Sequence, residues 1–232
     1  QIQSVQVNLS NYDVTQKGYT GANINAVTKS GTNELSGSVY YVFRDESMVG
    51  RRYNRTTQTF FDAPAFQDST VGFTLGGPII KDRLFFFASY EEFSSSRSSP
   101  SFGPIGSPLT NVGITPAAIA DAIRISRNTW GMNVGSPEIP GGLAVEVKDT
   151  LLKLDWNISD NHRASLRYTK TDQTEPNIAG FSPTGLSLSS WWWNQAKVLD
   201  TTVAQWFADW TPTFSTELKI SQRSYDSIPT QV

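Results

Sequence analysis

Cysteine is absent from the 232-residue chain, and histidine occurs once, at His162. The absence of cysteine excludes disulfides, thiol catalysis and thiolate metal sites, and it suits an exported protein that avoids stray oxidation. A single histidine gives no basis for a histidine-based zinc centre or a Ser-His-Asp triad. We therefore expect no metal, no other cofactor and no enzymatic activity.

The chain is also poor in charge and in long apolar runs. Charged residues make up 17% of it and the net charge is −2. Because no stripe of lysine and arginine stands out, a nucleic-acid partner is not expected. No stretch approaches 18 consecutive apolar residues, which excludes a transmembrane helix. The chain opens on Gln1 without a signal peptide, so we expect a processed N-terminus or a piece of a longer protein.

Aromatic residues, in contrast, are abundant. They make up 12% of the chain, and three of the seven tryptophans are consecutive. Membrane-interface belts and carbohydrate-binding surfaces both concentrate aromatic side chains. The composition therefore leaves two classes open, a membrane β-barrel and a soluble carbohydrate-binding module built as a β-sandwich.

Alternating apolar and polar residues predict strands along most of the chain. A helix is predicted only at 116–130, where Thr115 can cap and Pro116 suits the first helical position. In the hairpin around Asn161, a midpoint at that residue predicts that Trp156 faces Leu166 and that Leu154 faces Tyr168. Seven strands of about ten residues are expected, from one lone strand and three hairpins, at 34–45, 71–93, 149–172 and 203–224.

Short and long connections alternate strictly along these strands. In an antiparallel meander this alternation places every long loop at the same end, as in transmembrane β-barrels. The predicted fold class is therefore all-β, an antiparallel transmembrane β-barrel meander that is partial, with one short helix in an outer loop. A soluble β-sandwich, with two packed sheets, is the alternative. The connections fall at 81–83, 160–162 and 211–215 (short) and at 45–69, 98–145 and 176–197 (long).

The stretch "LGGPIIKDRLFFFASYEEF", residues 75–93, contains the strongest apolar cluster. Strand alternation places Phe85 and Phe87 on the inner face, where another segment must cover them. Pro78 cannot donate to the ladder and predicts a bulge or an early strand start in the partner strand. The residues expected to face lipid are Leu84, Phe86, Ala88 and Tyr90.

Four separated motifs, at 18–46, 73–93, 153–173 and 207–221, resemble TonB-dependent outer-membrane transporters. The similarity is to their Oar-like branch, whose full-length members carry an N-terminal carboxypeptidase-regulatory-like domain. The resemblance implies a plug inside a 22-stranded barrel, in the bacterial outer membrane. Residues 1–33 would be the end of the plug and 34–232 the first, incomplete part of the barrel. Implied partners are outer-membrane lipid, an imported ligand of unknown identity and an inner-membrane energy-coupling complex that acts through regions outside this chain.

The tryptophan run, Trp191, Trp192 and Trp193, falls in a predicted outer loop. It could stack on a sugar or peptide ligand, whereas an aromatic interface belt or a loop that packs on itself is the simpler interpretation. Adjacent residues on a strand point to opposite faces, so at most two of the three could serve one surface.

Basic and aromatic residues follow the first predicted barrel strand at Arg51, Arg52 and Tyr53. This cluster could attract an anionic ligand, although a solvated loop is the simpler interpretation. Polar contacts inside the lumen are expected from Lys153, Asp155 and Arg167.

Overall fold

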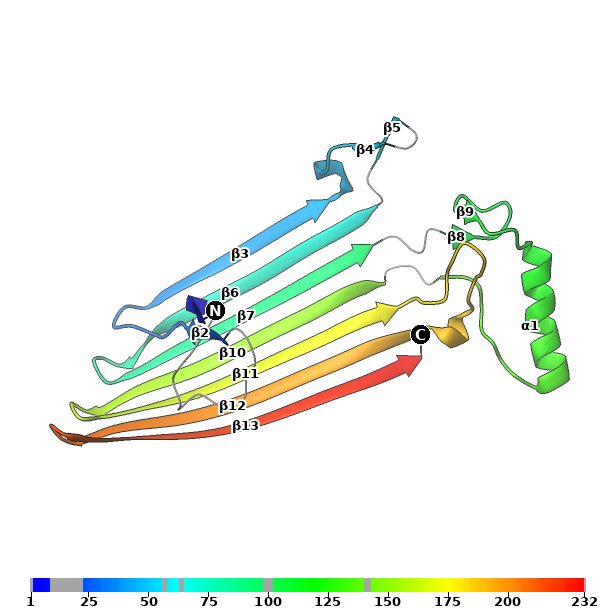
Figure 1. Cartoon of the computed structure of the whole chain (residues 1–232). Helices are drawn as coiled ribbons and strands as arrows, with labels where there is room; N and C mark the ends of the chain where they lie inside the picture. The colour runs from blue at the N-terminus through cyan, green and yellow to red at the C-terminus, as the bar shows by residue number, and fades with distance from the viewer. Residues whose placement is uncertain are drawn as a thin grey trace.

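The computed structural model describes residues 2–8, 23–55, 58–62, 65–97, 102–139 and 143–231. Residues 18–22 of the first motif lie outside this part. Seven strands form one antiparallel sheet in the order β13-β12-β11-β10-β7-β6-β3 (Figure 1). The strands are β3 (Ser36–Asp45), β6 (Phe66–Ile80), β7 (Leu84–Arg97), β10 (Ala144–Ser159), β11 (His162–Asn177), β12 (Trp193–Thr211) and β13 (Phe214–Gln231).

The sheet is a meander, since each of its strands pairs with the one before and after it in the chain. Tight turns join the strands at one end and the long connections lie at the other, beside the helix (Figure 1). This arrangement confirms the antiparallel meander and the placement of the loops. The strands, however, are longer than expected, with 14 to 19 residues in all but β3. The strands are longer because polar residues on both sides of the apolar stretches also pair with the neighbouring strands.

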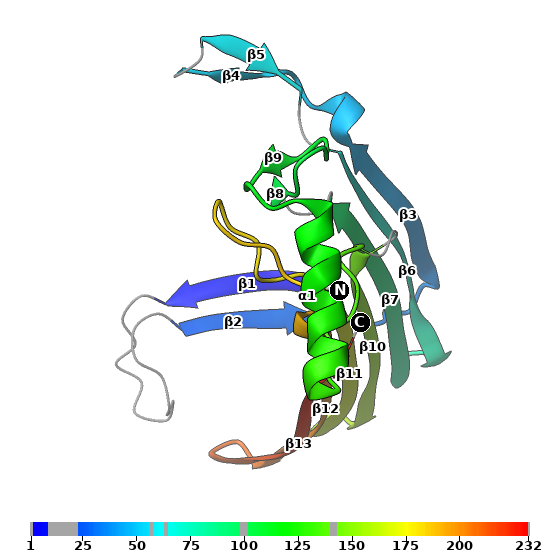
Figure 2. The same ribbon diagram turned by 90° about the vertical axis from the view of Figure 1, so that its right-hand side faces the viewer.

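The sheet curves as a single layer with a convex and a concave face (Figure 2). On the convex face Leu152 and Trp156 are each 49% exposed, Leu166 is 46% exposed and Trp206 36%. A sandwich would bury these residues between two layers. In the described part of the chain no second layer covers them, so the two packed sheets of the alternative fold are not formed.

The predicted register of the β10–β11 hairpin is wrong by two residues. Trp156 pairs with Ala164 and Leu154 with Leu166. The turn is tighter than expected because Ser159 already pairs with His162, and a register shift next to Ser159 absorbs the difference. The predicted face of each side chain survives, because a slip of two residues preserves strand parity. Pro78 also lies beside a register shift, as expected.

The long connections carry the remaining elements. Helix α1 (Pro116–Trp130) begins where the Thr115 side chain accepts the Ala118 N–H at 3.1 Å, and it ends at left-handed Gly131. Within the described residues, no helix has the length and apolar character to cross a membrane. The short elements are η1 (Glu46–Met48), β4 (Arg52–Asn54), β5 (Thr59–Phe61), β8 (Phe102–Gly103), β9 (Thr110–Asn111) and η2 (Ser189–Trp191).

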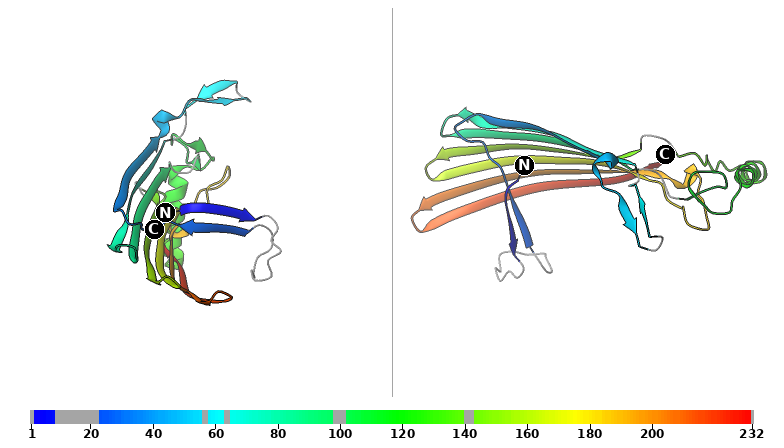
Figure 3. Two further views of the ribbon diagram at one scale, coloured as in Figure 1. Left: turned by 90° about the vertical axis from the view of Figure 1, so that its left-hand side faces the viewer. Right: turned by 90° about the horizontal axis from the view of Figure 1, so that it is seen from above.

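The N-terminal hairpin, β1 (Ile2–Asn8) with β2 (Asn23–Thr28), projects from the concave side of the sheet (Figure 3). Residues 29–35 lead from β2 along the wall into β3. The division into plug and barrel near residue 33 stays a prediction.

Candidate functional site

The convex face near the tight turns is an apolar surface built from two adjacent cross-strand rows. Each row contains one alanine among four large apolar side chains, and none of the members is charged. The rows are Leu84–Trp156–Ala164–Trp206–Leu218 and Phe86–Leu154–Leu166–Ala204–Ile220. An exposed apolar surface of this size marks a site of contact with a membrane or with another protein.

Charged residues begin farther along the same face. Lys148 lies 3.5 Å from Glu92, and Lys170 lies 3.0 Å from Asp172. From Leu84 to Glu92 the strand rises about 26 Å, or about 20 Å along the membrane normal at a tilt of about 40°. The apolar band therefore has roughly the height of the hydrocarbon-facing belt of membrane barrels, about 25 Å.

Aromatic residues mark both limits of this band. At the charged limit the Tyr90 hydroxyl donates to Glu92 at 2.9 Å and the Tyr168 hydroxyl donates to Asp200 at 2.6 Å. Their rings face the apolar band while their hydroxyl groups meet the polar zone. Membrane barrels carry such girdles at both interfaces, because tyrosine and tryptophan are apolar with one polar end.

The limit at the tight turns is marked by tryptophan. The His162 ring stacks on Trp206 at 5.9 Å between centroids and meets Trp210 edge-on at 5.1 Å. The sequence predicted a short connection at 160–162, whereas in the structure His162 already belongs to β11. It opens β11 and is packed between two indole rings, because the turn closes one residue earlier than the sequence suggested.

The concave face holds the three residues expected to line the lumen. Lys153 forms an ion pair with Asp155 at 3.3 Å and donates to the Ser30 hydroxyl at 2.7 Å. Arg167 is the cross-strand neighbour of Lys153 on β11. Phe87 points to the same face and is only 6% exposed. The structure thus brings the three charged side chains together beside the segment that leaves β2.

Residues 29–35 are fixed to the wall by a reciprocal pair of hydrogen bonds. The Asn33 amide nitrogen donates to Asp82 Oδ1 at 2.5 Å, and the Asp82 N–H donates to Asn33 Oδ1 at 2.8 Å. Asp82 adopts a positive φ of 64°, which a tight turn imposes. Gly31 lies so close to Gly77 and to the carbonyl of Phe86 that a β-carbon would not fit. The segment therefore sits directly on the β6–β7 hairpin.

The three consecutive tryptophans have different environments. Trp192 is 1% exposed, stacks on Phe181 and donates to the Ser187 hydroxyl at 2.7 Å. Trp191 is 65% exposed, and Trp193 begins β12. Trp192 therefore holds the loop together, as the self-packing interpretation proposed, and Trp191 is the ring available to a ligand.

The basic cluster lies in a separate hairpin, β4–β5, beyond the β3 edge (Figures 1 and 2). Arg51 contacts Asp62 at 3.3 Å and donates to the Phe60 carbonyl at 3.1 Å, while Tyr53 packs against Phe60. Arg52 is exposed on the same strand. The fold does not bring this cluster together with the tryptophans, which lie in the connection between β11 and β12.

One candidate ligand cavity was missed by sequence reasoning. It has a volume of about 430 Å³ and lies between α1 and the loop before Trp191, with mostly apolar walls that include Ile119, Ala122, Phe181 and Leu188. The apolar face of 116–130 was visible in the sequence, but its partner 60 residues away was not. In the described residues no group of three metal-ligating side chains gathers.

Comparison with known proteins agrees with this geometry. A family model described as an outer membrane beta barrel domain matches residues 27–137. The TonB-dependent transporter Oar of Myxococcus xanthus is 40% identical over 74 residues, which cover 31% of this chain and 7% of that transporter. No solved structure matches the chain significantly.

The curved meander, the apolar convex face between two aromatic levels and both similarities lead to one conclusion. The chain is a partial antiparallel β-barrel of the bacterial outer membrane, and its convex face meets lipid.

Proposed function

We propose that the chain is part of an energy-coupled outer-membrane transporter, which captures a ligand at its long loops and imports it. Residues 1–33 are the end of the plug and 34–232 the first part of the barrel. The observation that supports this most is the fixed course of residues 29–35 along the concave wall, held by Asn33, Ser30 and Gly31. A plug inside a barrel needs such an attachment where its chain passes into the first strand.

The energy source in this proposal is an inner-membrane coupling complex that acts through regions outside the chain. It rests on similarity to a TonB-dependent transporter over a short segment. The chain contributes binding and passage, with no cofactor and no covalent step. Lys153, Asp155 and Arg167 supply polar contacts to a solute in the lumen, while Trp191 and the Arg51–Tyr53 hairpin meet it outside.

The proposal is tested by comparing three strains, the parent, one lacking the full-length gene and one lacking the coupling protein. Mass spectrometry of spent medium identifies solutes that the parent removes. We expect at least one solute to remain in the medium of both mutants. The proposal would be contradicted if the strain without the gene removed every solute normally. It would also be contradicted if removal required the gene but continued in the strain without the coupling protein.

A second arm places ligand capture on the outer loops. Trp191→Ala in the full-length protein should slow removal of the same solute, because an exposed indole offers a stacking surface. Trp130→Ala is the matched control, since Trp130 is similarly exposed at the end of α1. Equal rates for both variants and the parent would remove Trp191 from the binding surface while leaving the transport proposal intact.

A further inference from the structure

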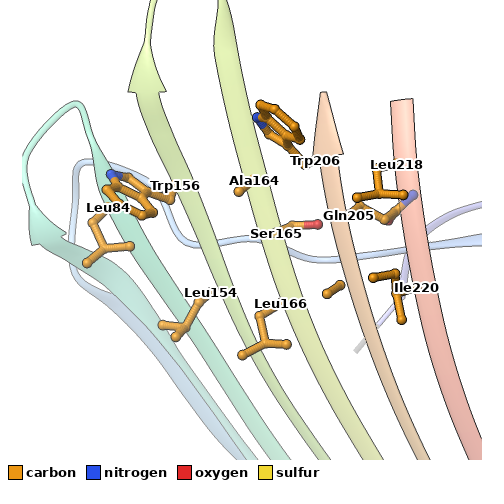
Figure 4. A pocket seen from close by; sticks show the side chains of 11 residues that line it. Leu84, Leu154, Trp156, Ala164, Ser165, Leu166, Gln205, Trp206, Leu218 and Ile220 are labelled. Atoms are coloured by element: carbon orange, nitrogen blue, oxygen red, sulfur yellow. The ribbon is translucent and has the colours of Figure 1, made fainter. Parts of the chain in front are cut away.

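A hollow of about 420 Å³ interrupts the convex face close to the tight turns (Figure 4). Its floor is formed where Ala164 and Ala204 occupy neighbouring strands. In one row Ala164 lies between Trp156 and Trp206, and in the next Ala204 lies between two larger aliphatic side chains. The hollow is therefore produced by the choice of small residues at two positions of a face that is otherwise bulky.

The lining of the hollow is apolar. No charged side chain contributes to it, and strand parity directs the side chains of Ser165 and Gln205, its two polar members, to the opposite face. The indoles of Trp156 and Trp206 stand on either side of Ala164 (Figure 4). A hollow of this kind excludes a polar ligand, because a buried polar group without a partner costs free energy.

The position of the hollow selects a leaflet. Short turns of outer-membrane barrels lie on the periplasmic side, and Leu84, which follows the 81–83 turn directly, lines the hollow. The turn carries exposed Lys81 and Arg83, two cations that could pair with a lipid phosphate. The charged residues of the other limit, such as Lys148, lie at the far end of the apolar band.

We propose that this hollow binds one acyl chain of a phospholipid from the periplasmic leaflet, as a fixed site within the lipid-facing surface. The hollow is continuous with the surface that already meets hydrocarbon, which favours lipid over a protein partner. A second protein would bury about 800 Å² on each side in a stable complex, whereas the hollow accommodates a narrow chain. The two indoles bound the chain laterally, so its exchange is slower than that of lipid on the flat parts of the face.

Native mass spectrometry tests this site on the full-length protein in mild detergent, titrated with phosphatidylethanolamine of one defined chain length. The double variant Ala164→Leu/Ala204→Leu fills the floor. Ala88→Leu is the matched control, because Ala88 faces the same side on β7 and does not line the hollow. We expect the parent and Ala88→Leu to retain one phospholipid at detergent concentrations where the double variant retains at least tenfold less.

Heat-dependent gel mobility verifies that each variant is folded. If the double variant does not fold, the milder Ala204→Val should still reduce retention several-fold. Equal retention by the parent and a folded, filled variant would overturn the site. Retention of added lipid A in preference to phosphatidylethanolamine would also overturn it, since lipid A belongs to the opposite leaflet. None of these outcomes depends on ligand import.

Discussion

The aromatic ring of Tyr40 lies across the bare backbone of Gly72 on the neighbouring strand. A β-carbon on Gly72 would come within 2.5 Å of that ring. The Tyr40 hydroxyl passes over the glycine and donates to the carboxylate of Glu91 one strand farther on. Because an aromatic ring can shield the backbone at a strand glycine, these residues tie β3, β6 and β7 together on the concave face.

Substituting Gly72→Val should displace Tyr40 and break its bond to Glu91. We expect the free energy of unfolding to fall by about 1–3 kcal/mol, the usual cost of overpacking. Urea titration of the full-length protein in lipid vesicles measures the change. Gly50→Ala is the control, since nothing lies within 4 Å of a β-carbon there. An equal effect at both positions would mean that the ring is free to move.

The assignment of the two faces predicts opposite tolerance at adjacent residues. Leu166→Arg places a charge in the lipid-facing band and should cost about 2–4 kcal/mol of unfolding free energy near the bilayer midplane. Ser165→Arg places the same side chain on the concave face and should cost much less. The same vesicle titration compares them. A greater loss at Ser165 than at Leu166 would reverse the assignment of the faces.

The attachment of residues 29–35 can be weakened at Asn33. Asn33→Leu removes both hydrogen bonds to Asp82. Because both groups are exposed and water can replace the lost partners, we expect a cost of about 0.5–1.5 kcal/mol per bond. Amide hydrogen exchange of residues 29–35 should accelerate, because local opening becomes easier. Glu34→Gln, a neighbour outside this pair of bonds, is the control. Unchanged exchange in Asn33→Leu would show that other contacts hold the segment.

Trp191 and Trp192 should respond differently to truncation. Trp192→Ala removes a buried ring and its bond to Ser187, and we expect a loss of about 3–5 kcal/mol in local stability. Trp191→Ala removes an exposed ring and should leave the loop ordered. Hydrogen exchange of residues 178–192 distinguishes the two. Similar protection in both variants would contradict the structural role of Trp192.

The sequence correctly predicted which face of the sheet a side chain occupies, because side chains alternate between the two faces along a strand. Phe85 and Phe87 were predicted to face inward and to need cover, and Phe87 is buried on the concave face beside residues 29–35. The residues Trp156, Leu154 and Leu166 were predicted to share one face, and they lie together on the convex face. Parity is a local property, so it is readable from one strand.

Other features depend on details that alternation does not encode. The slip of two residues at Ser159 reflects the closure of one turn, and strand length depends on whether polar residues such as Glu92 and Lys148 keep pairing. A loop packing on itself was one interpretation of the tryptophan run, but which indole is buried could not be predicted, because Phe181 and Ser187 reach Trp192 through the folding of the loop. The apolar cavity beside α1 likewise needs two segments far apart in the chain.

The sheet holds the two aromatic limits of the apolar band at a fixed separation. Tyr90 and Tyr168 mark the charged limit, and Trp206 and Trp210 mark the limit at the tight turns. Sliding the barrel along the membrane normal would drag one set of polar groups into hydrocarbon. The spacing of the two aromatic limits therefore sets the hydrocarbon thickness that fits this sheet best. In a thicker membrane, lipids next to it must shorten, and this hydrophobic mismatch costs fractions of a kcal/mol per Å. Those lipids would form a thinned collar around the protein.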